Sequence, residues 1–207
     1  MYTIQRITRM NIFFLSLIPI EIANMSCDQH VVKIQLEICQ MLYTAWYFSG
    51  EEEIIHTCAP FIKGVVEFEE KGNRVLIKVN LKSSKYKNST HGIHVHEAGD
   101  LTHNCMGACS HFNPYNKKHG GPKSSERHVG DIGNIKFDSK GVAKFRMYDN
   151  LIKLKGYKAN IIGRSLVIHE DPDDLGIGGH NDSLTTGHAG KRITCAVIGY
   201  SKRMFCK

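Results

Sequence analysis

Hydrophobic and polar residues alternate along most of the chain from residue 61 onward, in short runs typical of half-buried β-strands. The runs 61–70 and 74–81 are separated by Lys71-Gly-Asn73, which predicts a hairpin turn. Short strands at fairly even spacing, with few helical patterns, favour an antiparallel β-sandwich or barrel. Further strands are predicted at 91–97, 132–137, 142–148, 161–169 and 193–200, with a second turn at 138–141.

Two long segments interrupt this alternation. Residues 98–131 form a stretch rich in Gly, Pro, Asn and His, and residues 170–192 form another long loop. Loops of this length inside a compact domain are usually functional rather than passive connections. The chemistry of the protein is therefore expected in these two loops and in the strands beside them.

The N-terminal part of the chain has a different character. Arg6 and Arg9 precede the apolar run 12–20, which has the length of the hydrophobic part of a secretory leader and is too short to span a bilayer. A second apolar stretch, 34–48, indicates either an amphipathic helix or sequence upstream of the true start. We therefore divide the chain into an N-terminal extension, 1–50, and one domain, 51–207. Secretion is the expected localisation, with the cytoplasm as the alternative, and no stable membrane span is expected.

Composition narrows the range of partners. The 207-residue chain is 42% hydrophobic, enough for one sizeable core, and carries a formal net charge of +7. Its pI near 9.0 favours an anionic partner. The sequence has no block of five Lys or Arg residues, no zinc-finger spacing and no aromatic–basic stripe, so nucleic acid is not expected and a small anionic substrate remains. Seven cysteines without a CxxC pair leave at least one thiol unpaired and do not fix the redox compartment.

The run 91–97 carries the strongest chemical signal. His94 and His96 are two residues apart and fall on one face of a strand, while Ile93 and Val95 take the face toward the core. His169 ends a later predicted strand, so a rigid scaffold holds it as well. Imidazoles beside a carboxylate suit copper and zinc better than magnesium or calcium.

A second group of candidate ligands lies in, or at the end of, the first long loop. His111, His119, His128 and Asp131 have seven, eight and two residues between them. Three imidazoles and a carboxylate make the closed tetrahedral set of a structural zinc site, which would offset the entropy cost of ordering a Gly- and Pro-rich loop. The strand histidines beside it would leave an open face for a redox metal. Any one of these histidines alone is more often a surface or hydrogen-bonded residue, and no role is assigned to His30, His56, His103, His180 and His188.

The candidate ligands lie in a series of motifs whose order resembles the copper/zinc superoxide dismutases over about residues 58–199. The resemblance implies an all-β fold, an eight-stranded antiparallel Greek-key β-barrel related to immunoglobulin-like sandwiches, in a homodimer with one copper and one zinc per subunit. It also implies that superoxide is converted to dioxygen and hydrogen peroxide by alternate reduction and reoxidation of copper, as protection against oxidative damage. The matching motifs are His91–Glu97, His111–Pro114, Lys118–Pro122, Glu126–Asp131, Ile162–Glu170, Asp173–Gly176, Thr186-Gly187 and Arg192.

The resemblance also assigns metal ligands residue by residue. His111 would bridge the two metals and take a proton when copper is reduced, and Asp173 would link a copper histidine to a zinc histidine through hydrogen bonds. The copper ligands would be His94, His96, His111 and His169, and the zinc ligands His111, His119, His128 and Asp131.

Three further roles follow from the same resemblance. Arg192 would dock the anion beside copper, because a guanidinium stays cationic at any working pH, and Thr186 would form the opposite side of the channel. Cys105 and Cys195 match an intrasubunit disulfide, which would contribute about 3–5 kcal/mol. A copper chaperone is an expected partner.

The sequence departs from the family pattern at two functional places. The second long loop reads His180-Asn-Asp-Ser-Leu-Thr-Thr186, with one carboxylate and no lysine, so the field that steers the substrate is expected to differ from that of relatives. Cys109 and Ser110 stand where relatives have Gly-Pro, and Cys109 is a competitor of Cys105 for the disulfide.

Two other functions compete with the enzyme. A copper-delivery protein would need a Met-x-Cys-x-x-Cys module, which residues 1–53 lack. An inactive dismutase-like metal-binding protein would be expected to lose ligands or the channel arginine, and all of them are present. Sequons occur at Asn24, Asn88 and Asn181, and Asn88 is expected to be the most accessible if the chain is secreted.

Overall fold

The structure is a computed structural model, and it describes residues 31–36 and 61–200. The predicted leader run 12–20 and most of the apolar stretch 34–48 lie outside the described residues. The beginning of that stretch differs from the amphipathic helix, one of our two interpretations, because Val31–Leu36 forms strand β1, which pairs antiparallel with the next strand. The domain boundary at residue 51 stays a prediction, and β1 lies on its N-terminal side.

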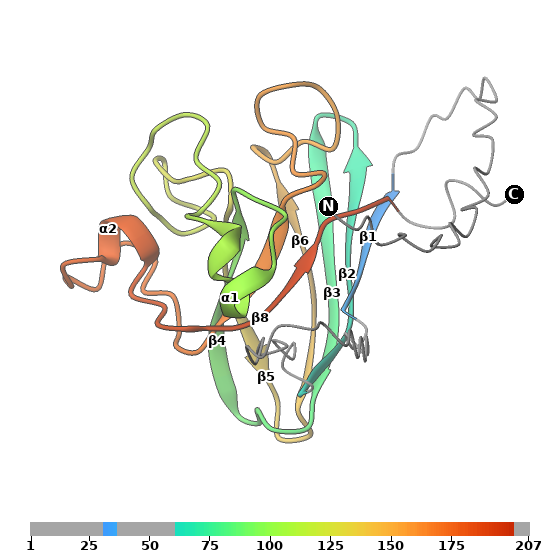
Figure 1. The fold of residues 1–207 in the computed structure, drawn as a ribbon, viewed down its shortest axis with the longest axis vertical. Coiled ribbons are helices and arrows are strands. Elements are labelled where there is room, and N and C mark those ends of the chain that lie inside the picture. Colours follow the sequence, from blue (N-terminus) through green and yellow to red (C-terminus); the bar gives the residue numbers. More distant parts are fainter. Residues whose placement is uncertain (1–30, 37–60, 201–207) are drawn as a thin grey trace, which may run out of the picture.

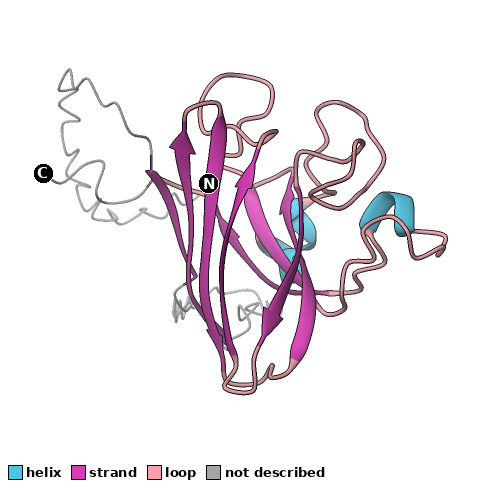
Figure 2. Cartoon of the chain, turned by 180° about the vertical axis from the view of Figure 1, so that it is seen from behind, coloured by secondary structure: helices cyan, strands magenta, loops and turns pink. Residues whose placement is uncertain are grey.

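Within the described residues, eight strands form two antiparallel sheets of four (Figures 1 and 2). The strand order is β1-β2-β3-β6 in the first sheet and β5-β4-β7-β8 in the second. The strands after β1 are β2 (Ile62–Lys71), β3 (Arg74–Ser83), β4 (Ser89–His96), β5 (Asp131–Phe137), β6 (Val142–Asp149), β7 (Ser165–His169) and β8 (Arg192–Val197).

All seven strands predicted from the alternation are present, with boundaries shifted by a few residues. The β2–β3 hairpin turns at Gly72, whose φ of +63° favours glycine, and its register pairs Lys71 with Arg74. The all-β prediction is confirmed in its sandwich form. The closed barrel is not, because the chain passes from β5 in one sheet to β6 in the other through the turn 138–141, and no ladder joins these two strands in the described part of the chain.

The core lies between the two sheets, where the alternation places one face of each strand. Fully buried side chains such as Phe68 and Ile77 from the first sheet meet Ile135, Phe137 and Leu166 from the second. Ile93 and Val95 of β4 belong to the same core, as their positions opposite the histidines predicted. This packing fixes β4 and β7, the two central strands that carry candidate ligands.

The two long loops pack on each other beside β4 and β7. The first contains α1 (Thr102–Cys105) and the 3₁₀ turn η1 (Met106–Ala108), and the second contains α2 (Ser183–Thr186), all short helices in segments predicted as irregular. Both helices lie on the side of β4 and β8 (Figure 1). The backbone N–H of His119 donates to the carbonyl of Leu184, 2.9 Å away, and joins the loops. None of the helices described is long and apolar enough to cross a membrane.

Candidate metal centre

Strand β4 presents two histidines away from the core. Its register with β5 shifts between Ile93 and His94, and the register of β7 with β8 shifts at Ile168 and His169. Such irregularities re-aim side chains and occur often beside functional sites. An isolated bridge then pairs His96 with His111, which brings the first long loop against the end of β4.

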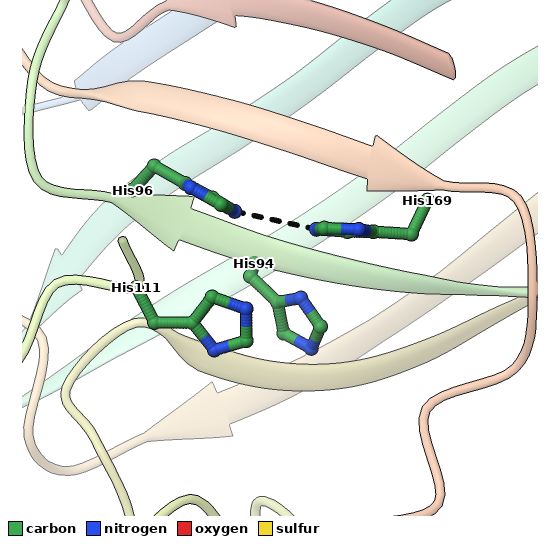
Figure 3. Close-up of side chains that lie close together, drawn as sticks. All are labelled: His94, His96, His111 and His169. Carbon is green, nitrogen blue, oxygen red and sulfur yellow. Dashed lines mark hydrogen bonds between the residues drawn. The ribbon is translucent and has the colours of Figure 1, made fainter. Parts of the chain in front are cut away.

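Four buried histidines converge on one point, and we call them the four-histidine set. One ring nitrogen of each lies within 4.8 Å of the others. Figure 3 shows the Nε2 atoms of His96 and His169 facing each other, 3.2 Å apart, with the His94 and His111 rings side by side below them. The set consists of His94, His96, His111 and His169.

A second set surrounds one carboxylate oxygen of Asp131, and we call it the three-histidine set. The Nδ1 atoms of His111, His119 and His128 lie 3.0, 3.0 and 3.1 Å from that same Oδ1 atom. A tetrahedron of ligands at about 2.0 Å from a zinc ion has edges of about 3.3 Å. Four ligand atoms spaced in this way fit a closed tetrahedral ion.

Buried nitrogen atoms without hydrogen-bond partners test whether these sets fit metal ions. Among the described side chains, the buried atoms without a partner are His94 Nδ1, His111 Nε2 and His119 Nδ1. The His119 Nδ1 atom is near Asp131 but not aligned to donate to it. Burying a polar atom without a partner is costly, and each of these three lone pairs faces one of the two sets. The donor sets therefore fit copper and zinc.

Hydrogen bonds fix which nitrogen of each strand histidine is left for a ligand. His96 donates from Nδ1 to the carbonyl of Cys109, 2.8 Å away, and His169 donates from Nδ1 to the carbonyl of Gly190, 3.2 Å away. Their Nε2 atoms therefore face the four-histidine set. His111 has Nδ1 in the three-histidine set and Nε2 in the four-histidine set, the geometry of a bridging ligand.

Asp173 links one histidine of each set through hydrogen bonds. Its carboxylate accepts hydrogen bonds from His94 Nε2 and from His119 Nε2, both 2.8 Å long and fully buried. The side chain of Asn134 bonds both the N–H and the carbonyl of Asp173 at 2.8 Å, which fixes that residue against β5. At Gly187 an added Cβ would lie 2.1 Å from Asp173 Oδ1, so only glycine lets the second loop pass over the carboxylate.

Burial keeps the four-histidine set uncharged. It lowers the pKa of His94 well below its ordinary value, and the charge of neighbouring His111 lowers it further. The same two causes, burial first, lower the pKa of His96 to about 2 and that of His169 to about 4. Neutral imidazoles have a lone pair available, which is the form that binds a metal ion.

The three-histidine set holds positive charge instead. Burial alone would lower the pKa of His119, but the adjacent carboxylates of Asp131 and Asp173 outweigh it and raise the pKa to about 9. Burial would raise the pKa of Asp131, but the adjacent imidazoles of His111, His119 and His128 keep it far below its ordinary value. In the metal-free protein, His119 of the three-histidine set thus carries a proton at the place where a metal cation would fit.

Arg192 lies directly across from His169 in the β7–β8 register. Its guanidinium donates to the carbonyls of Cys105, Met106 and Cys109 in the first long loop. The disulfide between Cys105 and Cys195 joins that loop to β8, and its cysteines have a sequence separation of 90. Cys109, which we considered as a competitor, is an exposed free thiol.

A cavity of about 780 Å³ opens over both sets. His96, His111 and His169 lie at its walls, together with Thr186 and Arg192. A small anion therefore has a path to the open side of the four-histidine set, where the structure places the candidate docking residue.

The structure brings together all of the ligand residues predicted from the sequence, and it places Thr186 and Arg192 on their common cavity. Sequence reasoning missed Asn134, and it named Gly187 only as part of the motif Thr186-Gly187, without a role. An Asn inside a strand is unfavourable, which was a usable signal for Asn134. The close approach of Gly187 to Asp173 had no signal in the sequence, because a glycine in a loop is ordinary.

Comparisons with known proteins agree with this geometry. The family model for copper/zinc superoxide dismutase (SODC) matches residues 62–198, more than half of the chain. A Cu-Zn superoxide dismutase of Paramecium bursaria Chlorella virus 1 is 58% identical over 145 residues, which cover 70% of this chain and 76% of that protein. Cu-Zn superoxide dismutase A of Xenopus laevis is 48% identical over 139 residues, 67% of this chain and 90% of that protein.

A solved structure shares the fold. The crystal structure of the clock protein EA4 matches with a TM-score of 0.68 and 33% sequence identity, over 86% of this chain and 98% of that chain. The two ligand sets share one histidine, and the likenesses cover most of the domain. The chain therefore belongs to the copper/zinc superoxide dismutase family.

Proposed function

We propose that the protein catalyses the disproportionation of superoxide, in which two superoxide anions and two protons give dioxygen and hydrogen peroxide. The single observation that carries this function is His111, which offers one nitrogen to each ligand set at the wall of an open cavity. Copper held by the four-histidine set would supply a redox couple that accepts and returns one electron, and zinc held by the three-histidine set would supply fixed positive charge.

The residues of the chain provide the proton and the substrate position. His111 lies at the wall of the cavity with its Nε2 atom in the four-histidine set, and burial lowers the pKa of His111, so a proton taken up there is readily given to the product. His111 Nδ1 stays beside Asp131, which keeps the ring oriented during that transfer. Arg192, held on three carbonyls, offers a fixed positive charge for a small anion, and Thr186 lies on the same cavity.

The test is superoxide disappearance catalysed by the full chain after loading with copper and zinc, with the metal content measured. A rate on the order of 10⁸–10⁹ M⁻¹s⁻¹ is expected if the site works as proposed. Arg192→Glu should slow the reaction severalfold while both metals stay bound, because it reverses the docking charge and Arg192 belongs to neither ligand set. No rate above that of free copper, with both metals bound, would mean a metalloprotein without this activity.

Finer properties extend the proposal. We assign one copper ion to the four-histidine set and one zinc ion to the three-histidine set of each subunit. The donor types and the family support this assignment. We also infer that the two sheets correspond to the halves of the family's Greek-key barrel. A homodimer and loading by a copper chaperone follow from the family, and sedimentation of the metal-loaded chain tests the dimer.

Secretion is our proposed localisation, supported by the leader-like run 12–20 after Arg6 and Arg9. Expression of the full chain in eukaryotic cells tests it. Recovery from the medium with a shortened N-terminus would support secretion, and retention in the cytoplasm at full length would refute it.

A further inference from the structure

Exposed lysines gather at the end of the sandwich that carries the turn 138–141 (the lower end in Figure 1). The segments 61–63, 82–88 and 138–144 meet there through backbone hydrogen bonds. The N–H of Ser83 donates to the carbonyl of Gly141, 2.7 Å away, and the N–H of Ser84 donates to the carbonyl of Phe61, 3.0 Å away. These segments contain six exposed lysines, which we call the lysine patch: Lys63, Lys82, Lys85, Lys87, Lys140 and Lys144.

Strand pairing places three lysines of the patch side by side on the first sheet. Lys63 on β2 lies directly opposite Lys82 on β3. On its other side Lys82 pairs with Val142 of β6, and Lys144 follows two residues later on the same face. Neighbours of this kind are about 5–8 Å apart, and like charges directly opposite each other destabilise a sheet. The fold gains nothing from these charges, and an anionic partner would relieve their repulsion.

Acidic side chains do not neutralise the patch. Among the described residues, no carboxylate lies within ion-pair distance of its six ammonium groups. The one carboxylate of the three segments, Asp138, accepts the backbone N–H groups of Lys140 and Val142 at 2.8 Å. Glu67 and Glu69, further along β2, pair with lysines outside the patch. The charges of the patch are therefore available to a partner.

The patch covers two sides of the domain. Its strand lysines point outward from the first sheet, because the residues that precede them, Ile62, Leu81 and Ala143, are buried. Its other three lysines lie beyond the strand ends, in the connection 84–88 and the turn 138–141. The positive charge thus runs around an edge of the domain. A flexible polyanion can follow such an edge, whereas a bilayer is flat and duplex DNA is stiff over about 50 nm.

The aromatic rings beside the patch are poorly placed to stack with nucleic-acid bases. The Lys85 ammonium group lies over the rings of Phe61 and Tyr86, 5.4 and 5.1 Å from their centres. Proteins that bind single-stranded nucleic acid combine cations with open aromatic faces. The patch therefore favours a flexible partner that is recognised by its charge alone.

We propose that the lysine patch binds a linear sulfated polysaccharide. Sulfate groups stay ionised at any working pH, and a chain of sulfated sugars presents them in series to the six ammonium groups. Contacts of this kind release counterions from the polyanion, so binding weakens steeply as salt increases. None of the six lysines lines the cavity over the ligand sets, so a bound chain leaves that cavity open. The inference is independent of the proposed function.

Binding of the metal-loaded full chain to heparin over a range of salt concentrations tests the proposal. The chain is produced without glycosylation, so that Asn88 in the connection 84–88 carries no glycan. Replacing Lys63, Lys82 and Lys144 together by Gln should weaken binding about tenfold or more at low salt. The slope of log affinity against log salt should become shallower by about three, one for each cation removed. Metal content and superoxide removal should match those of the wild-type chain.

The matched control replaces three lysines outside the patch. Lys123, Lys155 and Lys158 are exposed and belong to none of the three segments, and their replacement by Gln changes the net charge equally. This variant should bind heparin as the wild-type chain does. Equal weakening in the two triple variants would overturn the patch, because net charge alone would then explain binding. Failure of the wild-type chain to bind heparin at low salt would overturn it as well.

Other polyanions test the choice of partner. Duplex DNA, vesicles that contain anionic phospholipid, and the sulfate-free polysaccharide hyaluronan are measured with the same variants. Each should bind more weakly than heparin does. If one of them binds as tightly, with the same loss in the variant of the patch, the assignment to a sulfated polysaccharide is wrong.

Discussion

The hydrogen bonds of Asp173 lead to a quantitative prediction for the variant Asp173→Asn. The carboxylate accepts from His94 Nε2 and His119 Nε2, both at 2.8 Å and without exposure to solvent. An amide has one acceptor oxygen, so its NH₂ group must face the N–H of one ring. That ring then either loses its hydrogen bond or changes tautomer, and the changed tautomer places a proton on the nitrogen that faces the ligand set.

The cost follows from the kind of bond removed. A buried hydrogen bond to a charged group contributes about 1.5–3 kcal/mol. At about 1.4 kcal/mol for each tenfold change, this corresponds to about 10–100-fold in metal affinity. His94 is held on the central strand β4, whereas His119 lies in a loop, so the ring of His119 is the freer to move. We expect zinc affinity to fall by this factor and copper affinity to fall less.

The assay is competition with a chelator of known affinity, with the bound copper and zinc quantified separately. Asp171→Asn is the control, because Asp171 is an exposed carboxylate of the same loop and loses the same charge. The reasoning fails if the Asp173→Asn variant is folded and binds both metals as tightly as the control does. Circular dichroism of the metal-free proteins shows whether each variant is folded.

Three more predictions follow from other features. Replacing Cys105 and Cys195 together by Ser should lower the free energy of unfolding by about 4–5 kcal/mol, measured by urea denaturation, because the bond closes a loop with a sequence separation of 90. It should also slow superoxide removal, because Arg192 is held on carbonyls of the tethered loop; an unchanged rate would contradict this. In the metal-free protein, His119 has its pKa raised to about 9, so its contribution to stability is complete below about pH 6.5 and disappears as the pH rises through 9. Denaturation midpoints that are flat from pH 6 to pH 10 would refute that assignment. Asn88 is exposed, so chain secreted from eukaryotic cells should be glycosylated there, and mass spectrometry showing it unmodified would count against this prediction.

The strand-borne part of the site was predictable from local physics. His94 and His96 fall on one face because successive strand residues alternate, and Ile93 and Val95 reach the core on the other face. The loop ligands were predictable from motif order, since no periodicity governs a loop. Arg192 lies across from His169 because the strand register shifts between Ile168 and His169. No local sequence pattern predicts such a shift.

Other features depend on contacts that are distant in sequence. Strand β1 was missed because its short alternating run merges into an apolar stretch that also suits a helix. The pairing of Cys105 rather than Cys109 with Cys195 depends on how the first loop packs against β8. An open sandwich and a closed barrel differ in the pairing between strand edges. Because the alternation of hydrophobic and polar residues is the same in both folds, the sequence pattern could not distinguish them.

The two-sided position of His111 has a thermodynamic consequence. One imidazole ring offers a nitrogen to each ligand set, so orienting it for one ion also orients it for the other. Occupancy of the two sets is therefore coupled, typically by about 1–3 kcal/mol between linked sites. The coupling is reciprocal: whatever factor bound zinc adds to copper affinity, bound copper must add to zinc affinity. A chain that acquires its metals one at a time thus holds the first ion more tightly once the second is bound, by the same factor that the first ion adds to the affinity for the second.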